Sequence, residues 1–184
     1  MTSNVLPPLP AQFRRGDDIY EIKVGVFASQ EEILHDIFDT FSDMLASPEK
    51  FGLPQIPYDM SFVGPDAQVS PDPNNLTTVA ELYLEQQDSW QALHIGQDPE
   101  DRKLHEIRIG LYGTEEQAYL VQSLLLNHLS PMDAHGAPLL DNDYQWKTWI
   151  LSPVQHAGEY GNYTHEYLYA RHGDIIIDPK KYQY

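Results

Sequence analysis

The feature that most constrains the fold of this chain is an internal repeat. Residues 21–29 (EIKVGVFAS) match residues 106–114 (EIRIGLYGT) almost position for position, so the two copies are offset by 106 − 21 = 85 residues. Both segments alternate with a period of two and are rich in β-branched and aromatic side chains. Those properties are typical of a β-strand, and we therefore predict a strand in each copy.

A helix start signal follows both strands. Each strand ends on a hydroxyl residue with Glu or Gln three positions later, namely Ser29 with Glu32 and Thr114 with Gln117. This is the pattern of a capping box, in which the hydroxyl and the longer side chain each bind a free backbone amide. We predict helices over 30–46 and 115–129, and both end at a Ser-Pro pair, where proline is incompatible with a continuing helix.

The repeat continues more weakly to the end of each copy. The matched pairs of predicted strands are 58–65 with 146–153, 78–84 with 163–169 and, as a possible third pair, 89–95 with 174–178. We predict an α+β fold of two duplicated β-α-β-β units, with an antiparallel sheet and two helices packed on one of its faces in a ferredoxin-like arrangement. The expected parts are a flexible proline-rich arm (1–17), an acidic first half (18–101) and an aromatic-rich second half (102–184), the halves forming one compact unit.

The charge of the chain is confined largely to one region. The formal net charge is −17, yet residues 31–101 hold 15 acidic residues and a single base, Lys50, which is a net charge of −14. This distribution argues against direct binding of nucleic acid or of an anionic membrane, since both require a basic face. No apolar stretch is long enough for a membrane helix, and the proline-broken start is unlike a signal peptide, so we expect a cytoplasmic protein.

The first predicted helix carries a dense acidic face. Its apolar residues fall on one side at helical spacing, and its other side presents Glu31, Glu32, Asp36, Asp39 and Asp43. Like charges three or four residues apart repel by a few tenths of a kcal/mol. Acids in the first turn complement the helix dipole, but Asp43 near the other end does not. We interpret this face either as a binding surface or as an ordinary solvated helix face.

The second predicted helix differs, because residues 118–132 contain no acid or base. Its apolar positions extend most of the way round the helix, so we expect burial on more than one side. Burial within the chain is one explanation, and a homodimer interface is the other.

Motifs for catalysis are absent from the sequence. There is no Cys, none of the eight His belongs to an HExxH or HxH pattern, and no phosphate-binding glycine loop or GxSxG elbow is present. We therefore expect no metal site and no cofactor. Aromatic side chains gather in the second half, where core packing and a protein interface are the two readings; the residues we single out are Trp146, Trp149, Tyr163 and Tyr167.

These observations lead to two functional hypotheses. The first is a non-enzymatic interaction or inhibitor protein whose acidic face, with aromatic anchors beside it, binds a basic partner. An immunity protein against a nuclease toxin and a DNA-mimicking inhibitor of a host-defence nuclease are the expected examples. The alternative is a small-molecule-binding protein or enzyme with a pocket lined by the four aromatic residues above and His165. A charge that serves only solubility is a third reading.

Overall fold

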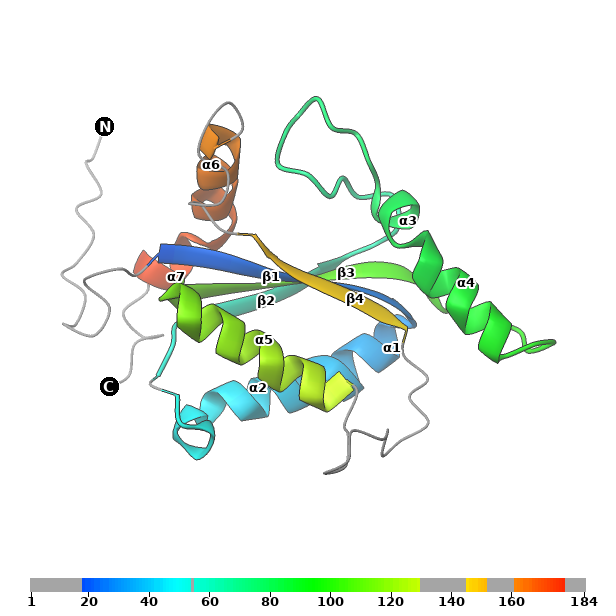
Figure 1. The fold of residues 1–184 in the computed structure, drawn as a ribbon, viewed down its shortest axis with the longest axis horizontal. Coiled ribbons are helices and arrows are strands. Elements are labelled where there is room, and N and C mark those ends of the chain that lie inside the picture. The colour runs from blue at the N-terminus through cyan, green and yellow to red at the C-terminus, as the bar shows by residue number, and fades with distance from the viewer. Residues whose placement is uncertain (1–17, 54, 130–144, 152–160, 178–184) are drawn as a thin grey trace.

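The computed structural model describes residues 18–53, 55–129, 145–151 and 161–177. Within them the chain has an α+β fold in which a four-stranded antiparallel sheet carries helices on both faces (Figure 1). None of the helices among these residues is long and apolar enough to cross a membrane.

The two repeated segments form the central strands of the sheet. The strands are β1 (Asp18–Ala28), β2 (Tyr58–Val63), β3 (Lys103–Gly113) and β4 (Trp146–Leu151), and their order is β2-β3-β1-β4. Every neighbouring pair is antiparallel. The structure confirms the strands predicted at 21–29, 106–114, 58–65 and 146–153. Strands β1 and β3 each begin three residues earlier than predicted, β2 ends two residues earlier, and residues 152 and 153 lie outside the described residues. The centre of the β1–β3 pairing places Lys23 opposite Arg108.

Both predicted capping boxes and both predicted helices are present. The first helical stretch is α1 (Gln30–Glu32), a π-helical segment η2 (Ile33–Phe38) and α2 (Asp39–Ala46), with a short 3₁₀ turn η3 (Pro48–Phe51) after it. Glu32 donates its amide to Ser29 Oγ at 3.2 Å, and Ser29 donates its own to Glu32 Oε1 at 3.0 Å. The second helix, α5 (Glu115–Leu129), starts with the same two bonds between Thr114 and Gln117.

The main core lies between these two helices and one face of the sheet. The central strands contribute their apolar alternate positions, and the helices contribute buried residues at helical spacing, among them Ile37, Phe41, Val121 and Leu125. Within the chain, α5 buries a single stripe, while Leu120 and Tyr119 stay 43% and 46% exposed; burial of this second side in a homodimer interface therefore stays a prediction. The uncharged sequence of α5 had suggested burial on more than one side.

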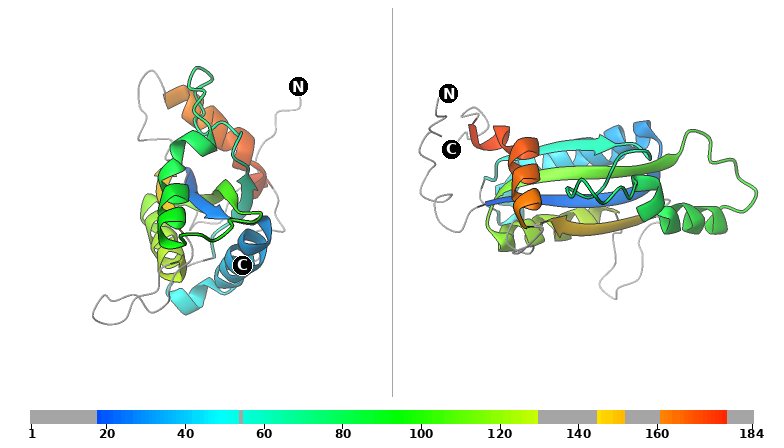
Figure 2. Two further views of the ribbon diagram at one scale, coloured as in Figure 1. Left: turned by 90° about the vertical axis from the view of Figure 1, so that its right-hand side faces the viewer. Right: turned by 90° about the horizontal axis from the view of Figure 1, so that it is seen from above.

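The other face of the sheet is covered by short helices where we had expected strands. Residues 78–84 and 89–95 lie largely in α3 (Val79–Leu82) and α4 (Leu84–Leu93), while 163–169 and 174–178 lie largely in α6 (Gly161–His172) and α7 (Asp174–Ile177). The sheet therefore has helices on two faces, as Figures 1 and 2 show, and not on one.

The spacing of the buried residues explains why these segments are helical. Leu168, His172 and Ile175 are all buried and follow one another at intervals of four and three residues, which is one side of a helix. At the start of α3, the Thr78 hydroxyl accepts a hydrogen bond from the amide of Glu81 at 3.3 Å and caps the helix.

Candidate functional site

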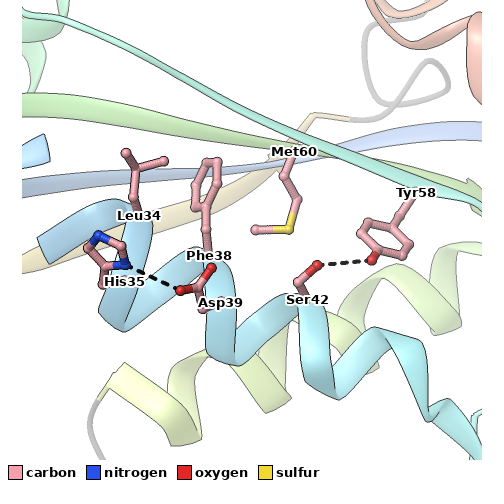
Figure 3. Close-up of a pocket in the computed structure, with 7 residues that line it drawn as sticks. All are labelled: Leu34, His35, Phe38, Asp39, Ser42, Tyr58 and Met60. Carbon is pink, nitrogen blue, oxygen red and sulfur yellow. Dashed lines mark hydrogen bonds and ion pairs between the residues drawn. The ribbon is translucent and has the colours of Figure 1, made fainter. Parts of the chain in front are cut away.

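A surface groove lies between the first helical stretch and the edge strand β2. Its volume is about 530 Å³, and it is lined by Leu34, His35, Phe38, Asp39, Ser42, Tyr58 and Met60 (Figure 3). The helix supplies the first five of these side chains and β2 supplies the last two. Three of the five, Leu34, His35 and Asp39, are exposed.

The groove combines an apolar floor with a polar rim. Leu34, Phe38 and Met60 point into the space between helix and strand, as Figure 3 shows. On the rim, His35 Nδ1 lies 3.4 Å from the carboxylate of Asp39, and a hydrogen bond of 3.3 Å joins the hydroxyls of Ser42 and Tyr58. A ligand that suits both parts needs an apolar portion next to a cationic or hydrogen-bonding group.

Strand β2 presents a free backbone edge beside this groove. The carbonyl of Pro57 accepts a hydrogen bond from the amide of Tyr112 on β3 at 3.0 Å. Hydrogen-bonded residues alternate along an antiparallel strand, so the backbone groups of Tyr58, Met60 and Phe62 point away from β3. Among the described residues these outward amides and carbonyls have no strand partner, because β2 is the last strand of the sheet.

The predicted acidic helix face shares one residue, Asp39, with the lining of the groove. Glu31, Asp36, Asp39 and Asp43 are exposed. Glu32 is not a free surface charge, because it takes part in the capping box and its Oε1 lies 3.1 Å from Nε of Arg102. Sequence reasoning placed all five carboxylates in one surface, and the structure keeps four of them there.

The remaining acids of the first half also lie outside the core. Twelve of the 15 acidic residues in 31–101 are exposed; besides the four on the helix they are Glu49, Asp66, Glu81, Glu85, Asp88, Asp98, Glu100 and Asp101. Arg102 joins two of the acidic segments, since it pairs with Glu32 and its guanidinium lies 5.2 Å from the centre of the Trp90 ring on α4. The acid excess is therefore a property of the surface.

The predicted aromatic anchors do not gather at the groove. Trp146 packs against the main core, whereas Trp149 stacks on Tyr83 at 5.8 Å beneath the opposite face of the sheet. Tyr167 is also on that second face, and the side chains of Tyr163 and His165 lie outside the described residues. Because Trp146 and Trp149 lie on opposite faces, they do not line one pocket.

A buried cluster of charged side chains occupies the centre of the second sheet face, and sequence reasoning missed it. On β1 it contains Glu21 and Lys23, and on β3 it contains the repeat-equivalent Glu106 and Arg108; none is more than 6% exposed. Lys23 Nζ lies 2.8 Å from Glu21 and 3.0 Å from Glu106, while Arg108 Nε lies 2.7 Å from Glu106.

Each carboxylate is also held by a ring that lies over a glycine of the opposite strand. Glu106 pairs with Gly25 across the sheet, and the Tyr83 hydroxyl donates to Glu106 at 2.7 Å from above that glycine. Glu21 pairs with Gly110, and the ring of His172 lies above Gly110 and donates to Glu21. The absence of a side chain at each glycine is what admits the ring.

The contacts of His172 suit a doubly protonated ring. Nε2 lies 2.5 Å from Glu21 and Nδ1 lies 2.6 Å from Asp59, and an imidazolium donates to both carboxylates. Burial alone would lower the pKa of His172, but the hydrogen bonds and charges of Asp59 and Glu21 outweigh it and raise the pKa. Likewise burial would raise the pKa of Glu21, yet the charge of Lys23 and the bond from His172 lower it to about 2.

The cluster is electrically balanced and fully hydrogen-bonded. Three cations (Lys23, Arg108 and His172) face three carboxylates (Glu21, Glu106 and Asp59). The loop before α3 completes it, since Arg108 donates to the Gln68 carbonyl and Lys23 to that of Val69. With every charge paired and all of these side chains except Asp59 buried, the cluster joins β1, β3, α6 and the loop before α3.

Within the part of the chain that is described, no group of His, Asp and Glu side chains is arranged to hold a metal ion. Comparison of the chain with protein-family models, with characterised proteins and with solved structures gives no match.

Proposed function

We propose that this chain is an acidic cytoplasmic interaction protein that binds a basic surface of a partner protein. The observation that supports the proposal best is the position of the groove. An apolar cavity of about 530 Å³ opens on the helix that carries Asp36, Asp39 and Asp43, so an anchoring site and a field of negative charge coincide. Protein interfaces commonly combine an apolar pocket with complementary charge at its rim.

The charge distribution supports a basic partner. Across residues 31–101 a single lysine faces 15 acids, and most of these acids are exposed. Such a surface accelerates association with a basic protein and suppresses binding of acidic competitors. Surfaces that normally contact nucleic acid are the commonest dense basic surfaces. We therefore propose an immunity protein against a nuclease toxin, or a DNA-mimicking inhibitor of a host-defence nuclease.

The test is binding to a panel of basic nuclease domains at increasing salt, with a basic protein that is not a nuclease as the reference. We expect affinity for one nuclease to fall steeply between low salt and about 0.3 M, where screening reaches contact distances. The triple variant Asp36→Asn, Asp39→Asn, Asp43→Asn should weaken binding, and a control with the same charge change on α3 and α4 (Glu81→Gln, Glu85→Gln, Asp88→Asn) should weaken it less. Affinity indifferent to salt and to the triple substitution would refute the proposal.

We further propose that the fold is a duplicated, ferredoxin-like one. Read from the other edge, the strand order is β4-β1-β3-β2, and α2 and α5 lie on the same face. The pairing is consistent with a two-fold relation between the halves. Glu21 pairs with Leu151 of β4, and its repeat-equivalent Glu106 pairs with Val63, the equivalent residue of β2.

A further inference from the structure

We propose that the partner contributes a basic β-strand, which adds to the free edge of β2 and places Lys or Arg side chains in the groove. This inference rests on the proposed function and names the kind of segment that the acidic surface binds. Two features carry it: the outer edge of β2, with which no described strand pairs, and a groove whose lining matches a long cationic side chain.

The backbone of β2 is arranged to accept another strand. The outward amides and carbonyls of Tyr58, Met60 and Phe62 form a row of donors and acceptors with the repeat of a sheet ladder. Tyr58 and Met60 also line the groove. In an antiparallel addition, the residues of the new strand that pair with these three extend their side chains to the same face, toward the groove.

The groove fits lysine or arginine better than it fits a purely apolar side chain. The aliphatic stem of such a residue would lie on Leu34, Phe38 and Met60, and its charged end would reach the carboxylate of Asp39. Asp43 lies one helical turn further along and is also exposed. A second Lys or Arg of the added strand, two residues from the first, can therefore pair with the carboxylate of Asp43. The rim contains the imidazole of His35, but it holds no Lys or Arg.

Charge also decides against a second copy of this chain as the added strand. Pairing of two β2 edges would bring the Asp36, Asp39 and Asp43 faces of both copies near one another. Like charges across an interface are repulsive, and neither groove has a lysine or arginine in its lining to relieve them. The edge is thus protected against self-pairing and open to a basic strand.

The experiment uses three fluorescein-labelled heptapeptides with blocked ends, in which Lys and Val alternate, and the full-length chain. The parent peptide has a normal backbone, the second is N-methylated at each Lys, and the third is N-methylated at each Val. Fluorescence polarisation measures binding at low salt. We expect the parent to bind and the peptide methylated at each Lys to bind about tenfold more weakly or worse, because the amides of the residues that extend into the groove face β2. The peptide methylated at each Val should bind like the parent.

Protein variants test the same contact from the other side. Met60→Pro removes the outward amide, while the β3-facing bonds of its neighbours remain. Met60→Val is the matched control that shortens the side chain and keeps the amide. We expect only the proline variant to lose peptide binding, with circular dichroism verifying that both are folded. If the proline variant does not fold, the two methylated peptides decide the question alone.

Failure of this inference can be distinguished from failure of the proposed function. Equal, salt-sensitive binding of all three peptides would overturn strand addition and leave the acidic surface as the binding site. Absence of binding by the parent peptide would also overturn strand addition, and the nuclease panel would still test the acidic surface. Parent binding unaffected by Asp39→Asn with Asp43→Asn would overturn the placement of cations in the groove.

Discussion

Replacing Glu106 by glutamine should be one of the most damaging conservative changes in the molecule. The side chain is fully buried, and its two oxygens accept hydrogen bonds from Lys23 at 3.0 Å, Arg108 at 2.7 Å and Tyr83 at 2.7 Å. Glutamine has nearly the same shape, but it removes one of three negative charges that balance three positive ones. The buried cations Lys23 and Arg108 then both lose the negative charge of Glu106.

The expected loss follows from the burial of the partners. Breaking a buried ion pair by neutralising one member costs about 3–5 kcal/mol, since the remaining charge is left uncompensated. The total stability of a domain is about 5–15 kcal/mol, so the variant should lose a large part of it. Urea denaturation followed by circular dichroism measures the difference in the free energy of unfolding. Glu85→Gln on the exposed side of α4 is the control and should change stability by less than about 0.5 kcal/mol.

A double variant separates charge balance from packing. Arg108→Met alone should destabilise the protein, but with Glu106→Gln it restores electrical balance, so the two losses should sum to more than the loss of the double variant. A loss below about 1 kcal/mol for Glu106→Gln, or strictly additive losses, would refute the view that the cluster depends on its paired charges.

Three further predictions concern other parts of the fold. Because its folded pKa is raised, His172 contributes stability that is fully present below pH 6.5 and is lost as the pH rises through the folded pKa. The urea concentration at the unfolding midpoint should therefore fall as the pH rises above 6.5. The variant His172→Gln should abolish this pH dependence of the midpoint. An unchanged pH dependence would contradict the paired imidazolium. Gly25→Ala or Gly110→Ala would drive a methyl group into the ring above and should cost about 3 kcal/mol, whereas Gly64→Ala enters open space and should be nearly neutral in thermal unfolding. Ser29→Ala removes a helix cap and should cost about 1 kcal/mol in the same assay; no change would show that the capping bond is not stabilising.

Local signals in the sequence predicted the first face of the sheet well. The strands, the two capping boxes and the two long helices each depend on residues within a few positions of one another. The strands predicted on the second face were wrong; around Tyr167, alternating aromatic residues resembled a strand, and the structure has the helix α6 there. Leu168, His172 and Ile175 are buried at helical spacing, but the sequence does not show that these three residues are the buried ones.

The acidic face was predicted from the sequence, but the groove and the charged cluster were not. A groove between a helix and an edge strand depends on strand order, which no local pattern specifies. The cluster did leave a signal, because Glu21 and Lys23 recur as Glu106 and Arg108 inside otherwise apolar strands. Acid and base at alternate positions of two central strands, with a glycine two positions later, indicate a buried ionic face.

The pairing of Lys23 opposite Arg108 has a consequence for how two strands of similar sequence can pair. At the centre of a symmetric strand pair each residue meets its own counterpart, so a base there always meets a base. The carboxylates two positions earlier remove the conflict. Glu21 lies 2.8 Å from Lys23 and Glu106 lies 2.7 Å from Arg108 within each strand, and Glu106 also reaches Lys23 across the pair at 3.0 Å. A Glu-x-base spacing therefore supplies every base with a carboxylate when two such strands pair. The same short motif on both strands is thus compatible with antiparallel pairing about this centre, because it brings a carboxylate wherever it brings a base.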